Sequence, residues 1–99
     1  MEIIKKKENE KLIIAVEGRI DSTTAPELES AVNSEIRECE ELMFDFKKLD
    51  YISSAGLRIL LGAQKLMGNH GMKVINVNDT VNEIFEITGF SLILDYEKA

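Results

Sequence analysis

The chain has 99 residues, of which 44% are hydrophobic and 30% are charged, and its formal net charge is -6. This length suits one domain with one core, and the balance of apolar and charged residues argues against an intrinsically disordered protein. The net negative charge opposes the phosphate backbone of nucleic acids, so direct binding to DNA or RNA is not expected. We therefore predict one domain over residues 1–99.

The sequence predicts a cytoplasmic protein that is not attached to a membrane. No apolar run approaches the length that spans a bilayer, and the first residues lack the order of a signal peptide. The single cysteine, Cys39, cannot form an internal disulfide and has no CxxC companion for zinc or redox chemistry. We expect it to pack as a small apolar group.

The first segment predicts a β-hairpin. Residues 3–7 and 12–16 are two short runs rich in strand-forming residues, and the polar residues 8–11 lie between them. This is the pattern of two strands joined by a short turn.

A helix is predicted next. After Gly18, the side-chain oxygens of residues 21–24 can cap a helix, and Thr24 and Glu27 have the spacing of a capping box. Apolar residues then recur at three- and four-residue steps over residues 28–36, which indicates one buried helix face.

A buried strand and a loop are predicted in the middle of the chain. Residues 42–46 are short, apolar and bounded by charges, which is typical of a strand buried on at least one face. Residues 47–52 are expected to form the loop that leads out of it.

A second helix is predicted from the Ser53-Ser54 pair onward. Leu57, Leu60 and Met67 share one face of this helix, and their spacing is that of core residues. Gly68 is a plausible end for the helix.

The last third predicts a strand, a helix and a short final strand. Residues 72–77 form the strand, Asn78 or Asp79 can cap the helix, and Gly89 can end it, while residues 92–94 are a candidate strand. Strands that alternate with helices imply parallel crossovers and a sheet with helices packed against it.

Two segments of the chain resemble the recurrent elements of the STAS domain. The string FDFKKLDYISSAGL, residues 44–57, resembles the signature shared by anti-sigma factor antagonists and the cytoplasmic parts of sulfate transporters. Upstream, residues 16–21 end in Gly-x-x-Asp before residues 24–28, which resembles the family's strand before its first helix. The two elements occur in the family's order and spacing, and the resemblance covers residues 1–99.

The resemblance implies an α/β fold with a mixed, mostly parallel sheet, an N-terminal hairpin and three to four helices packed on one side. Aligning Gly56 and Leu57 with the family's Gly-Leu pair places Ser54 on the phosphorylated position, at the start of the second helix. Ser53 stands where the family often has aspartate, and Ala55 where it often has serine or threonine. Gly56 is also expected to be a small-residue position beside the sheet.

The chemistry of this position suits a phosphate. The backbone N–H groups in the first turn of a helix are unpaired, and they stabilise an exposed anion by about 0.3 to 1 kcal/mol. A phosphate on Ser54 would add about 1.5 to 2 negative charges. Because the start of the helix tolerates this charge, phosphorylation is expected to leave the domain folded and to act on a protein that docks there. A serine here can also be only a helix cap.

The predicted site combines two segments. The phosphorylation site is Ser54. The predicted partner-binding residues are Asp21, Ser22, Thr23, Thr24, Ser53, Ser54, Ala55, Gly56 and Leu57.

The resemblance implies a regulator that is not an enzyme and needs no cofactor. Its unphosphorylated form would bind an anti-sigma factor that is a serine kinase and thereby release a sigma factor. Phosphorylation of Ser54 would end that interaction, and a serine phosphatase would restore it. One alternative is a constitutive scaffold or accessory subunit of a signalling or transport complex, with Ser54 only a cap. A second alternative, a sensor of a small ligand or nucleotide, lacks a phosphate-binding loop.

Residue patterns of common enzymes are absent. The single histidine, His70, is distant in sequence from Ser54, and no GxSxG, GxxxxGK[ST] or GxGxxG motif occurs. Three carboxylates could in principle meet at strand ends and hold Mg²⁺, but the resemblance implies that a separate kinase brings ATP and metal. These carboxylates are Asp21, Asp45 and Asp50.

Overall fold

The computed structural model describes residues 1–99 and begins with an antiparallel hairpin. Strands β1 (Glu2–Glu8) and β2 (Lys11–Ile20) pair along their length, and Asn9 in the turn has a φ of 57°. Asparagine enters this left-handed region more readily than most residues, which suits it to the turn. The predicted hairpin is confirmed.

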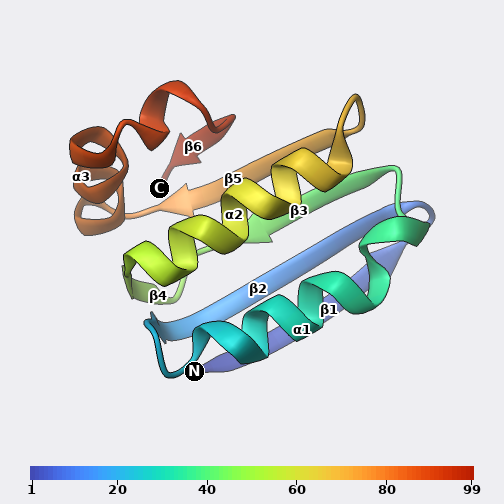
Figure 1. The fold of residues 1–99 in the computed structure, drawn as a ribbon, viewed down its shortest axis with the longest axis horizontal. Helices are drawn as coiled ribbons and strands as arrows, with labels where there is room; N and C mark the ends of the chain where they lie inside the picture. The colour runs from blue at the N-terminus through green and yellow to red at the C-terminus, as the bar shows by residue number, and fades with distance from the viewer.

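The remaining elements form one mixed sheet and its helices. They are α1 (Ala25–Glu35), η1 (Ile36–Glu38), β3 (Glu41–Asp45), β4 (Leu49–Ile52), α2 (Ser54–Met67), β5 (Gly71–Val77), α3 (Asp79–Thr88), η2 (Phe90–Leu92) and β6 (Tyr96–Lys98). The main strand order is β1-β2-β3-β5-β6, and only the β1–β2 pair is antiparallel. Figure 1 shows α1 and α2 side by side over one face of the sheet. The predicted mixed, mostly parallel fold is confirmed.

The segment over residues 47–52, predicted as a loop, contains strand β4. It pairs in parallel with the last residues of β2, where the register shifts between Gly18 and Arg19. Gly18 has a φ of +93°, a conformation that glycine adopts readily, and the resulting bulge lets β2 pair first with β3 and then with β4. The prediction was wrong because β4 is short and depends on this bend in a distant strand.

The final strand also differs from the prediction. Residues 92–94 do not form a strand, because the chain makes the turn η2 there, and Leu92 is 91% exposed. The last strand is β6, in which Tyr96 pairs with Val74 of β5. Only Leu94 of the apolar run enters the core.

Most of the predicted helix ends are correct. The side chain of Asn78 accepts a hydrogen bond from the Val81 N–H at 2.8 Å, and Gly89 ends α3 in a left-handed conformation. Gly68 ends α2 as predicted, but Thr24 makes no capping hydrogen bond at the start of α1. No helix is both long enough and apolar enough to cross a membrane.

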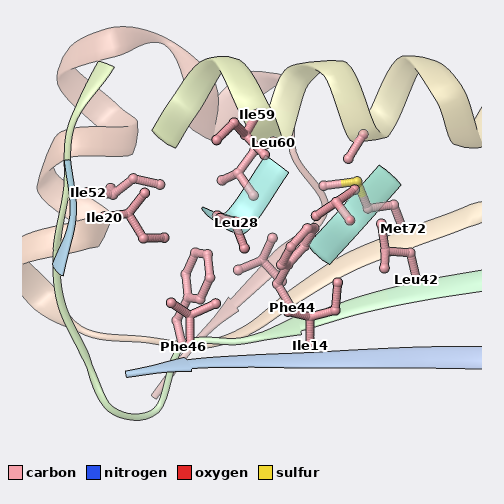
Figure 2. Close-up of a cluster of buried hydrophobic side chains, with 14 of the residues drawn as sticks. Ile14, Ile20, Leu28, Leu42, Phe44, Phe46, Ile52, Ile59, Leu60 and Met72 are labelled. Carbon is pink, nitrogen blue, oxygen red and sulfur yellow. The ribbon is translucent and has the colours of Figure 1, made fainter. Parts of the chain in front are cut away.

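The core lies between the sheet and the two covering helices. Figure 2 shows Phe44 and Ile14 of the sheet facing Leu60 of α2, and all three are fully buried. Leu57 and Met67 are buried in the same cluster, so the core face predicted for the second helix is confirmed. No polar or charged residue is buried.

Candidate functional site

The starts of α1 and α2 meet at the edge of the sheet where β2 and β4 end (Figure 1). Ile20 and Ile52 are the last paired residues of these two strands, and the Ser53 N–H then donates to the Ile20 carbonyl at 2.8 Å. This bond ties the turn that enters α2 to the turn at residues 21–24 that enters α1. The structure thus brings the two segments of the predicted site together.

The two adjacent serines differ in accessibility. Ser54 is the first residue of α2 and is exposed. The Oγ of Ser53 is buried and has no hydrogen-bond partner, and it does not cap the helix that it precedes. Of this pair, only Ser54 is therefore accessible to the active site of another protein.

Gly56 sets how closely α2 approaches the strands. A Cβ atom at this position would lie 2.6 Å from Ile20 Cγ2 and 2.6 Å from Ile52 Cγ1. Real contacts are longer than this, so any larger residue here would force the Ile20 and Ile52 side chains or the start of α2 to move. Gly56 and Leu57 are both buried, so the first turn of α2 is packed against the core and the position of Ser54 is fixed.

The turn into α1 is held by its own hydrogen bonds. Asp21 Oδ1 accepts hydrogen bonds from two backbone N–H groups, that of Thr23 at 2.9 Å and that of Thr24 at 3.1 Å. The Thr24 hydroxyl accepts a hydrogen bond from the Asp21 N–H at 2.9 Å and donates one to the Arg19 carbonyl at 2.9 Å. The predicted capping box of Thr24 and Glu27 is therefore wrong, because the Thr24 hydroxyl points back to the strand. The bond from the Thr24 N–H, followed by that from Thr23, lowers the pKa of Asp21.

This turn makes stability depend on pH in the acid range. Because the folded state lowers the pKa of Asp21, its carboxylate stabilises the fold above its unfolded pKa, near 4, and that contribution is lost as the pH falls through the lower folded pKa. We expect Asp21→Asn to be less stable than wild type at pH 7 and the difference to shrink toward pH 2. Urea unfolding of both proteins across this range measures it, and a constant difference would contradict the assignment.

A groove runs between the two helices beside Ser54. Its upper part has a volume of about 270 Å³ and is lined by Ser22, Ala25, Pro26, Glu29, Ala55, Arg58 and Ile59. An adjoining hollow of about 340 Å³ lies farther along the same helices and shares Glu29, Arg58 and Ile59 with it. Ser22 and Ala55 thus come from the two predicted segments and line one surface.

Glu29 and Arg58 line the groove but are not among the residues predicted for the site. Both are exposed and lie on helix faces that the apolar spacing assigns to solvent. The four-residue step from Ser54 to Arg58 places both residues on one side of α2, which is the one signal in the sequence that could have indicated Arg58.

The single cysteine and the single histidine do not line this groove. Cys39 is buried in the core as predicted, and its burial raises the pKa of the thiol. The Nδ1 of His70 lies 3.1 Å from a carboxylate oxygen of Glu40 at the surface. No three acidic, histidine or cysteine side chains form a group that could hold a metal ion. Asp21, Asp45 and Asp50 therefore do not meet in a metal site.

Comparison with known proteins identifies the family. The family model of the STAS domain matches residues 2–98, so the chain belongs to the STAS family. BtrV of Bordetella bronchiseptica is 39% identical over 82 residues, which are 80% of this chain and 71% of BtrV. The anti-sigma-B factor antagonist of Listeria monocytogenes is 30% identical over 95 residues, which are 93% of this chain and 83% of that protein.

Solved structures share the fold. SpoIIAA, an anti-sigma factor antagonist, superposes in its unphosphorylated form with a TM-score of 0.84 at 16% identity, covering 98% of this chain and 89% of SpoIIAA. The phosphorylated form of SpoIIAA, a Bacillus cell fate determinant, superposes with a TM-score of 0.76 at 15% identity, covering 98% and 92%.

Proposed function

We propose that this protein is an anti-sigma factor antagonist controlled by phosphorylation of Ser54. Its unphosphorylated form binds an anti-sigma factor that is also a serine kinase, and this frees a sigma factor. The observation that carries the proposal is the contrast between the serines: Ser54 is exposed beside the groove of α1 and α2, whereas the hydroxyl of Ser53 is buried. Of the two serines at the start of α2, a kinase bound at this surface could modify only Ser54.

Electrostatics explains how phosphorylation would end the interaction. A phosphate adds about 1.5 to 2 negative charges, and the unpaired N–H groups of the first turn of α2 tolerate it while Ser54 is in water. A docked protein would have to remove that water or match the charge. Like charges brought together at an interface cost several kcal/mol, so the complex dissociates while the domain stays folded.

The names of the relatives support the partner class. The Listeria monocytogenes protein is an antagonist of an anti-sigma factor, and SpoIIAA is known in unphosphorylated and phosphorylated forms. In this proposal the chain acts in the cytoplasm, by binding and not by catalysis. A separate serine phosphatase returns it to its binding form. It makes no direct contact with DNA, RNA or a membrane.

Phosphorylation of single-serine variants tests the proposal. Wild type, Ser53→Ala and Ser54→Ala are incubated with ATP and an extract of the native host, and the modified residue is located by mass spectrometry. We expect wild type and Ser53→Ala to be phosphorylated at residue 54 and Ser54→Ala to remain unmodified. Because the Ser53 hydroxyl has no hydrogen-bond partner, Ser53→Ala should also be at least as stable as wild type.

Two results would contradict the proposal. Phosphate on Ser53 would mean that accessibility does not select the site. No phosphate on any variant would favour a constitutive scaffold in which Ser54 is only the first residue of a helix.

A further inference from the structure

Arg58 is a cationic side chain on the same helix as Ser54, and it has no hydrogen-bond or ion-pair partner within the chain. It lies one helical turn after Ser54 on α2, is exposed, and makes no hydrogen bond or ion pair with any residue. The other arginine at this end of the molecule, Arg19, is engaged, because its guanidinium carbon lies 4.5 Å from the centre of the Tyr51 ring. Of these two arginines, Arg58 is the one free to pair with a new anion.

The position of Arg58 also connects Ser54 to the groove. Arg58 lines both parts of the groove between α1 and α2, with Glu29 across from it on α1. Residues four apart on a helix are neighbours on its surface, and a guanidinium can bind two oxygens of one phosphate at once. A phosphate on Ser54 would therefore compete with the groove for the same guanidinium.

We propose that Arg58 is the intramolecular counter-ion of phosphorylated Ser54. The inference rests on the proposed phosphorylation of Ser54 and adds its local consequence. In the unphosphorylated protein the guanidinium is available in the groove to a carboxylate of a docked protein. In the phosphorylated protein the guanidinium pairs with the phosphate. Phosphorylation therefore adds negative charge at Ser54 and also removes from the groove the cation that lines both of its parts.

A phosphorus NMR titration tests this pairing directly. Phosphoserine is incorporated at position 54 during translation, so that no kinase is needed, in wild type, Arg58→Gln, Arg58→Lys and Lys65→Gln. A phosphoserine phosphate ordinarily titrates near pH 6. Pairing with Arg58 should lower the titration midpoint in wild type by about 0.3 pH units relative to Arg58→Gln, as expected for an ion pair at this spacing.

The control variants separate pairing from general charge. Lys65→Gln removes the same charge from α2 eleven residues away and should titrate as wild type does, while Arg58→Lys should keep part of the shift. The side-chain Nε–H resonance of Arg58 should also move on phosphorylation. Equal midpoints for wild type and Arg58→Gln, or an equal change in Lys65→Gln, would overturn the pairing.

The titration and the phosphorylation assay can fail separately. If no kinase or anti-sigma factor acts on this chain, the phosphorylation assay fails while the titration still reports the pairing. If the pairing is absent, the titration fails while phosphorylation of Ser54 by a host kinase is unaffected.

Discussion

Ser54→Asp is expected to bind the anti-sigma factor at least 100-fold more weakly than wild type. Aspartate places a permanent negative charge at the exposed start of α2, next to the groove that we propose as the docking surface. A 100-fold loss corresponds to about 2.8 kcal/mol, which is within the cost of one poorly matched charge at an interface. Isothermal titration with the purified anti-sigma factor measures the two affinities.

Ser54→Asn is the matched control for this charge. Asparagine has nearly the shape of aspartate without its charge, so it should lose much less affinity than Ser54→Asp. Both variants should unfold at about the same denaturant concentration as wild type, because Ser54 makes no side-chain contact in the core. Equal binding by wild type and Ser54→Asp would show that charge at this position does not control docking.

Gly56→Ala is expected to destabilise the fold by about 2 kcal/mol, as overpacking of a well-packed site does. The new methyl group would lie 2.6 Å from carbon atoms of Ile20 and Ile52, both almost fully buried, so the side chains or the helix must shift. For a domain of this size the melting temperature should fall by on the order of 10 °C. Thermal unfolding followed by circular dichroism measures it.

Gly62→Ala is the control within the same helix. No atom lies within 4 Å of a Cβ built at Gly62, so alanine there should raise stability by about 0.5 to 1 kcal/mol through its better helix propensity. A loss of stability in Gly56→Ala together with a gain in Gly62→Ala would establish that Gly56 is required for close packing. A gain in stability at both would contradict the packing described for α2.

The fold was largely predictable from local patterns. The hairpin, the alternation of strands and helices, and the core face of α2 follow from the spacing of apolar residues, and Asn78 and Gly89 mark the ends of α3 with side-chain and backbone chemistry that is local. Strand β4 was missed because its partner is the end of β2, and only the bend at Gly18 makes that pairing possible.

The site was predictable only in part. The motif around Gly56 and the N-terminal position on the helix indicate Ser54 without a structure. The burial of the Ser53 hydroxyl is set by contacts from other elements, and the groove exists only because α1 and α2 pack side by side. Hydrogen bonding by Thr24 was mistaken for a cap because the same residue type can bond forward to the helix or back to the strand.

The most direct test of the account is a paired capture from a lysate of the native host, with wild type and Ser54→Asp as baits. Proteins retained by each bait are identified by mass spectrometry. We expect wild type to retain an anti-sigma factor with a kinase domain and Ser54→Asp to lose it. Identical sets of retained proteins on the two baits would contradict it.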